Sequence, residues 1–250
     1  MNTLKLSVII PSYNEETNIR LGVLDKVARF LEQKSYKWEV IVVDDGSTDA
    51  SPKLLDVFAE HNKGFMIIHN HHQGKAATVL TGMMRARGEI VLFTDLDQAT
   101  PIEEIDQLLP WFDKKFDVVI GSRNNEREGA PLLRRVMARG FMFLRTILLG
   151  LSGISDTQCG FKAFRQPVIR KVSSKLKLYE HGRDVRGSMV TAGFDIELLY
   201  VAKSLGFAIK EVPVQWHYVD TRRVSPLKDS WQGLVDILRI RNNARNNLYR

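Results

Sequence analysis

The chain has 250 residues, of which 44% are hydrophobic and 26% are charged. These values are ordinary for globular proteins and exclude a collagen-like, coiled-coil or wholly disordered chain. Its single cysteine, Cys159, excludes an internal disulfide and paired-cysteine zinc sites, and favours a reducing compartment. We expect no signal peptide at the start and no membrane-spanning helix, because no run of about 18 uncharged apolar residues occurs.

The net charge of +7 is unevenly distributed along the chain. Residues 1–120 contain 13 Lys/Arg and 18 Asp/Glu, whereas residues 121–250 contain 23 and 11. A basic second half favours a nucleic acid, an anionic membrane surface or a phosphorylated substrate as its partner. Because no helix-turn-helix or RNP-like pattern is present, we do not expect nucleic acid.

Strand and helix patterns alternate through the first half of the chain. Continuous Val/Ile runs are typical of strands that are buried on both faces, and they predict a mostly parallel sheet flanked by helices. The expected strands cover residues 6–11, 39–43, 65–68, 89–93 and 117–120. The expected helices cover 15–33, 73–87, a segment that starts at 48 or 49 and ends near 61, and one that starts at Pro101.

The second half of the chain is less regular. We expect an apolar helix with four arginines over residues 132–149, a loop at 156–162, a helix near 194–205 and a strand near 209–216, before a basic tail. An apolar helix with several arginines is typical of a helix lying in a membrane interface, although it is equally typical of a core helix whose arginines bind substrate. The tail arginines favour contact with anionic lipid (Arg239, Arg241, Arg245 and Arg250).

Polar motifs follow the predicted strands at 11–15, 44–47, 95–97 and 121–123. Ligands bind beyond the carboxyl ends of the strands in such sheets. No Gly-x-Gly-x-x-Gly follows the first strand, which disfavours a dinucleotide site, and Gly74-Lys75-Ala76 lacks the rest of a phosphate-binding loop. Asp95 and Asp97 are one residue apart, and in an extended segment they would point the same way. They therefore predict a Mg²⁺ or Mn²⁺ site that bridges a diphosphate.

Several motifs together resemble a known family. Residues 8–16 (VIIPSYNEE), 42–49 (VVDDGSTD) and 95–97 (DLD) are similar to those of the family 2 inverting glycosyltransferases of GT-A fold. The similarity continues through 121–123 (GSR) and 156–162 (DTQCGFK). Residues 193–197 (GFDIE) and 211–216 (EVPVQW) resemble the dolichyl-phosphate β-glucosyltransferase branch, with the mannose synthases next.

The resemblance implies an enzyme that moves a hexose from a nucleotide sugar to dolichyl or polyprenyl phosphate, with UDP-glucose as the expected donor. GDP-mannose as donor, or a non-lipid acceptor, stays open. It implies donor contacts at Pro11, Tyr13, Glu15, Asp44, Asp45 and Lys75, and Mg²⁺ or Mn²⁺ at Asp95 and Asp97. The mannose synthases carry a glutamine two residues after the second aspartate, where this chain has Ala99, so the third metal ligand is open.

The resemblance also assigns the acceptor side. It implies acceptor-phosphate arginines at Arg123, Arg135 and Arg139, with Arg222 and Arg223 closing over the diphosphate. Asp156 matches the acid that acts as a base or positions the acceptor, and Arg123, Asp97 and Asp156 are the expected catalytic group. We expect one domain over residues 1–250, with a nucleotide-sugar half (1–122) and a basic, membrane-facing acceptor half (123–250). The expected location is peripheral, on the cytoplasmic face of a membrane.

Overall fold

The computed structural model describes residues 4–123, 140, 142, 144–178, 192–217 and 226–249. A seven-stranded sheet runs through its centre, in the order β3-β2-β1-β4-β6-β5-β7. All strands run parallel except β6, which is antiparallel to both β4 and β5. The strands are β1 (Leu4–Ser12), β2 (Lys37–Asp44), β3 (Phe65–His69), β4 (Ile90–Thr94), β5 (Val118–Arg123), β6 (Phe161–Arg165) and β7 (Ile209–Val214).

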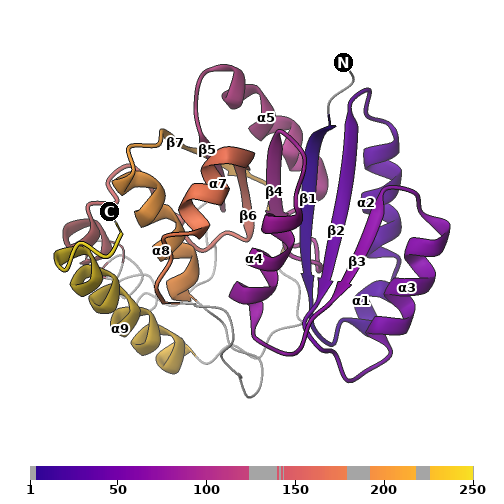
Figure 1. Ribbon diagram of the computed structural model, residues 1–250, viewed down its shortest axis with the longest axis horizontal. Helices are drawn as coiled ribbons and strands as arrows, with labels where there is room; N and C mark the ends of the chain where they lie inside the picture. Colours follow the sequence, from indigo (N-terminus) through magenta and orange to yellow (C-terminus); the bar gives the residue numbers. More distant parts are fainter. Residues whose placement is uncertain are drawn as a thin grey trace.

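Helices cover both faces of the sheet (Figure 1). One face is covered by α4 (Lys75–Arg85), α7 (Gln166–Ser173) and α8 (Ala192–Ser204), and α9 (Pro226–Arg245) packs on α8. The other packs against α1 (Glu16–Arg20), α2 (Val23–Glu32), α3 (Ser51–His61), the 3-10 turn η1 (Ile102–Glu104) and α5 (Ile105–Asp113). Neighbouring residues of a strand face opposite layers: Ile9 contributes to the first core and Val8 to the second. The double burial explains the uninterrupted apolar runs.

The sheet brings the predicted motifs to one edge. Ser12 at the end of β1 pairs with Asp44 at the end of β2, and Ile9 pairs with Phe93 near the end of β4. Because β6 is antiparallel to its neighbours, the loop before it arrives at this same edge and brings Asp156 there. The carboxyl ends of the parallel strands therefore form the floor of the site.

Three features of the fold differ from the sequence expectation. The helix expected over 15–33 is two helices, because Gly22 adopts a left-handed conformation (φ +72°) between α1 and α2. Ala50, instead of Thr48 or Asp49, precedes the first turn of α3. Strand β6 and helix α7 were not expected, since FKAFR is too short and too mixed in polarity to stand out from a loop.

The C-terminal half contains further helix. The segment expected to be a basic tail is helical: α9 covers 20 residues, and a short turn follows it. Of the helix expected over 132–149, residues 140, 142 and 144–149 are described, and they are helical. Within the described part of the chain, none of the helices combines the length and apolarity needed to cross a bilayer.

Candidate active site

Tyr13 and Glu15 lie in the loop that follows β1, and Pro11 lies within the end of that strand. The Tyr13 ring stacks on the ring of His72, with centroids 4.2 Å apart and planes 16° from parallel. Glu15 receives a bond from Asn18 Nδ2 at 2.5 Å, and its own backbone N–H donates to Ser51 Oγ at 2.8 Å. The loop is therefore fixed by contacts to α1 and α3, with one aromatic face of Tyr13 covered by the imidazole.

Asp44 is the last residue of β2 and Asp45 follows it; both are buried, each 2% exposed. Asp45 Oδ1 accepts the backbone N–H of Gln73, and Oδ2 accepts that of Gly74, both at 2.9 Å. His72 Nδ1 lies 2.9 Å from the same Oδ2. Asp45 therefore fixes the loop before α4, a role that the sequence alone did not indicate.

Asp44 makes fewer contacts than Asp45. Its Oδ1 accepts the backbone N–H of Ser47 at 3.3 Å, and its Oδ2 lies 3.4 Å from His69 Nδ1. The other ring nitrogen of His69 lies 2.9 Å from Asp56 Oδ1. Burial alone would lower the pKa of His69, but the hydrogen bonds and charges of Asp56 and Asp44 outweigh burial and raise it. The imidazole therefore favours its charged form more than a free histidine does, beside Asp44, which is one of the expected donor contacts.

Asp95 and Asp97 lie just past β4, and the extended backbone expected between them is not found. They were expected to point the same way in an extended segment, but residues 96–97 form a turn in which the backbone N–H of Gln98 donates to Asp95 O at 3.2 Å. Asp97 Oδ1 accepts the N–H of Ala99 at 3.1 Å. Asp95 Oδ1 lies 2.5 Å from Lys75 Nζ at the start of α4. Strand alternation therefore does not orient these two carboxylates.

The two acids fit a divalent cation by their donor chemistry. Both offer hard carboxylate oxygens at a strand end, and the structure already holds a cation, the Lys75 ammonium, against Asp95. Among the described residues, no group of three or more His, Cys, Asp or Glu is arranged to hold a metal. A Mg²⁺-type site that uses one or two carboxylates with phosphate oxygens and waters matches this set.

Arg123 and Asp156 form the acceptor side of the described site. The Arg123 Nε and Nη2 atoms donate to the two oxygens of Asp156 at 2.7 and 2.9 Å, and its backbone N–H donates at 3.1 Å. Burial alone would raise the pKa of the Asp156 carboxyl, but Arg123 outweighs burial and holds that pKa below its usual range. Asp156 is therefore an ionised partner of Arg123, which is also 5.7 Å from the Trp216 ring.

The loop that carries Asp156 is held by side chains that sequence reasoning missed. Glu211 of β7 accepts the backbone N–H groups of Ser155 and Asp156 at 2.8 and 2.7 Å. Arg145, only 3% exposed, donates to Thr157 Oγ1 at 2.9 Å and to the Ile154 carbonyl at 2.5 Å. The sequence offered one indication of these contacts, because Glu211 is the first residue of the EVPVQW motif. These contacts make the loop a rigid support for Asp156.

Lys162 is another side chain near the site that sequence reasoning did not single out. It is fully buried in β6, and its Nζ lies 2.6 Å from Asp195 Oδ1 and 2.5 Å from the Cys159 carbonyl. Asp195 thus acts as the counter-ion of a buried lysine. Its neighbour Glu197 accepts the Tyr249 hydroxyl at 2.7 Å and the backbone N–H groups of residues 177 and 178. Both acids of the GFDIE motif therefore have structural partners.

Cys159 lies in the loop that precedes β6. Cys159 is 1% exposed, and burial raises the pKa of its thiol to about 11, which is unsuited to a nucleophile. His69 and His72 have the aspartate partners described above, and no described histidine joins a metal-binding group. Four expected arginines lie outside the described residues: Arg135, Arg139, Arg222 and Arg223.

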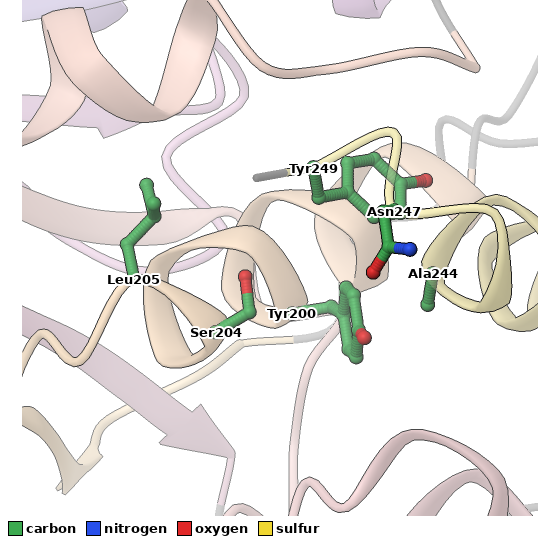
Figure 2. Close-up of a pocket in the computed structure, with 6 residues that line it drawn as sticks. All are labelled: Tyr200, Ser204, Leu205, Ala244, Asn247 and Tyr249. Carbon is green, nitrogen blue, oxygen red and sulfur yellow. The ribbon is translucent and has the colours of Figure 1, made fainter.

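A pocket of about 230 Å³ lies elsewhere, between α8 and the turn that ends the chain (Figure 2). Its lining is partly aromatic and contains none of the expected site residues: Tyr200, Ser204, Leu205, Ala244, Asn247 and Tyr249. It lies on the α8–α9 side of the molecule, and we assign the chemistry to the strand ends instead.

A mostly parallel sheet whose strand ends gather carboxylates, a lysine and an arginine is the arrangement of the GT-A glycosyltransferases. Solved structures in that class share the fold. Mannosyl-3-phosphoglycerate synthase from Rubrobacter xylanophilus aligns over 97% of this chain and 76% of its own, with a TM-score of 0.67 and 16% identity. Glucosyl-3-phosphoglycerate synthase from Mycobacterium tuberculosis, in complex with Mn²⁺, UDP and glucosyl-3-phosphoglycerate, aligns over 96% and 80%, with a TM-score of 0.62 and 18% identity.

Sequence comparison establishes the family. The model of glycosyl transferase family 2 matches residues 7–173, and the chain belongs to that family and is a glycosyltransferase. Dolichyl-phosphate beta-glucosyltransferase of Dictyostelium discoideum is 32% identical over 96% of this chain and 75% of its own length. The Drosophila melanogaster enzyme of the same name is 36% identical over 90% and 70%. The expected family and fold class are thereby confirmed.

Proposed function

We propose that the chain transfers glucose from UDP-glucose to dolichyl or another polyprenyl phosphate and gives a β-linked lipid-phosphate sugar. The observation that carries this proposal is the similarity to dolichyl-phosphate beta-glucosyltransferases over nearly the whole chain. Residues 1–122 would bind the donor and residues 123–250 the acceptor, within one domain. Glucosyl transfer to a lipid phosphate is consistent with the second, basic half of the sequence.

The donor side would bind through the ends of β1, β2 and β4. Asp44 would accept a hydrogen bond from the base, with Pro11, Tyr13 and Glu15 beside it and Asp45 holding the loop that leads to Lys75. Asp95 and Asp97 would hold Mg²⁺ or Mn²⁺, which supplies Lewis-acid stabilisation of the diphosphate as it leaves. The complex of the mycobacterial synthase with Mn²⁺ and UDP supports this choice of cation.

The acceptor phosphate is mostly dianionic at neutral pH, because its second pKa is about 6. One of its oxygens forms the new bond to the anomeric carbon while the bond from that carbon to the donor diphosphate breaks. The nucleophile therefore needs alignment more than proton removal. Arg123 would supply a charge-assisted contact to this phosphate, with Arg135, Arg139, Arg222 and Arg223 as further expected contacts. Asp156 would hold the Arg123 guanidinium in place.

A polyprenyl tail stays in the bilayer, so we propose that the enzyme docks on a membrane at its cytoplasmic face. Large apolar side chains are exposed on two helical segments: Leu144 and Ile147 on one, and Trp231 (68%) and Leu238 (51%) on α9. Arg239 lies next to Leu238 with 60% of its side chain exposed. Apolar residues beside arginines suit an interfacial helix that binds anionic lipid.

The test is incubation with polyprenyl phosphate, Mg²⁺ or Mn²⁺, and labelled UDP-glucose or GDP-mannose in parallel, followed by solvent extraction. We expect label in the organic phase from UDP-glucose alone. Label from GDP-mannose alone would change the donor, and no lipid label from either would contradict a lipid acceptor. Asp97→Ala should lose transfer with little change in melting temperature, since the Asp97 carboxylate lies in the turn after β4, where it accepts the backbone N–H of Ala99.

A further inference from the structure

Lys75 and Asp95 make a direct ion pair at the centre of the donor site. Lys75 Nζ lies 2.5 Å from Asp95 Oδ1, and the two side chains are 27% and 17% exposed. The other carboxylate oxygen, Oδ2, packs against the backbone at Gly160, where an added Cβ would overlap it. The two carboxylate oxygens therefore have different close neighbours: Lys75 lies at Oδ1 and the backbone of Gly160 lies at Oδ2.

A divalent cation on Asp95 would compete with this ion pair. A cation bound through Oδ1 would lie within a few ångströms of the ammonium, and like charges repel strongly at that distance in a partly buried site. Lys75 must leave Oδ1 when the cation binds. In the protein alone, Lys75 places a positive charge against this partly buried carboxylate.

Lys75 has another partner within reach once the donor arrives. It is the first residue of the 11-residue helix α4, and it follows Gly74, whose φ is +87°. The start of a helix carries a partial positive charge and free backbone N–H groups, which favour phosphate. A lysine leaving Asp95 from this position would meet the diphosphate that the cation also binds.

We propose that Lys75 is an exchangeable counter-ion of Asp95, which moves to the donor diphosphate when the divalent cation binds and so makes cation and nucleoside diphosphate bind cooperatively. This inference rests on the proposed function. The proposed function already names the cation and the nucleoside diphosphate as ligands. The new element is that Lys75 couples the binding of one to the binding of the other. Arg123 differs because three of its donors hold Asp156, whereas Lys75 approaches Asp95 with a single ammonium group on a flexible side chain.

The test is a binding cycle measured by calorimetry and by the Mn²⁺ resonance signal. Wild-type protein is titrated with Mn²⁺ alone, UDP alone, and Mn²⁺ at saturating UDP, and the ratio of the two Mn²⁺ affinities is the coupling factor. In Lys75→Gln we expect Mn²⁺ alone to bind about tenfold more tightly and the coupling factor to fall by about tenfold. Lys75→Arg keeps the charge and should keep the coupling.

Lys34→Gln is the matched control. It removes a lysine that pairs with Asp106 at 2.6 Å on the α2–α5 side, and it should change neither affinity. Circular dichroism would check the fold of each variant. Unchanged or weaker binding of Mn²⁺ alone by Lys75→Gln, or an unchanged coupling factor, would overturn the proposal. Wild-type protein that binds no UDP would instead contradict the proposed function, and with it this inference.

Discussion

The pairing of Arg123 with Asp156 separates two roles for the acid. If Asp156 positions Arg123, its loss should misplace the guanidinium and leave the chemistry of proton transfer unchanged. If Asp156 is a general base, its loss should remove a titrating group. The substitutions that distinguish these roles are Asp156→Asn, Arg123→Ala and the double variant.

The structure sets the expected size of the effect on stability. Three donors of Arg123 lie 2.7 to 3.1 Å from the carboxylate, and the two side chains are 26% and 11% exposed. Removing one partner of such a pair costs about 3 kcal/mol, because the other charge is left largely buried. The double variant should lose little more than either single variant, which gives a coupling energy of about 2 to 3 kcal/mol. Urea unfolding of the four proteins measures this value.

The kinetic expectation follows from the same geometry. Asp156→Asn should lower kcat/KM for polyprenyl phosphate about 10- to 100-fold, since a displaced Arg123 aligns the phosphate poorly. The acid limb of the pH–rate profile should keep its midpoint near 6, where the acceptor phosphate loses its second proton. Asp156 does not account for that limb, because Arg123 holds the pKa of its carboxyl below the usual range.

The assay is lipid-extracted label as a function of pH and acceptor concentration, for the wild type and Asp156→Asn. Loss of the acid limb in the variant, with stability unchanged, would refute the positioning role and assign proton removal to Asp156. Additive unfolding energies in the double variant would show that the two side chains do not depend on each other.

Two further predictions concern the donor side. His69 contacts Asp44 and Asp56, and its raised pKa means that this pair stabilises the fold below pH ~6.5 and loses the effect as pH rises through the higher folded-state pKa. His69→Gln should therefore reduce the unfolding free energy more at pH 5.5 than at pH 9. The loss at pH 5.5 should not exceed about 1 kcal/mol, because the ring is partly exposed. Equal losses at both pH values would contradict the pairing, and His61→Gln on α3 is the control. Gly160→Ala should displace Asp95, since the new Cβ would overlap its carboxylate. Calorimetry should then show Mn²⁺ binding weakened at least tenfold with UDP present. An affinity equal to that of the wild type would disprove the close approach of the Asp95 carboxylate to Gly160.

The sequence predicts the first half of the fold well, because its strands are buried on both faces. Runs such as Val40 to Val43 carry apolar residues at every position, and the motifs after them identify the strand ends. β6 escapes this reasoning because Lys162 and Arg165 interrupt its apolar pattern, and their partners lie on other elements. Gly22 lies within an otherwise continuous helical pattern, so the break between α1 and α2 depends on a backbone angle that the pattern does not determine.

The residue types of the site were predictable, but their partners were not. Lys75 and Asp95 are 20 positions apart, and Arg123 and Asp156 are 33 apart. The first pair meets because α4 begins at the edge of the sheet where β4 ends, and the second pair meets because antiparallel β6 brings the loop before it to that same edge. The turn at Leu96 and Asp97 shows the same limit, since a motif of three residues specifies composition and leaves backbone direction open.

Both ion pairs follow one electrostatic requirement, but with different consequences. Under the proposed function, the site holds a donor diphosphate, an acceptor phosphate and a divalent cation, and its own charges are costly to leave unpaired when these ligands are absent. Asp156 accepts two side-chain donors and the backbone N–H of Arg123, and these three bonds hold the guanidinium in one geometry. Lys75 pairs with Asp95 through an ammonium on a flexible side chain, which a divalent cation would replace under this proposal. The rigid pair suits alignment of the acceptor, and the exchangeable pair suits coupling the donor to its metal.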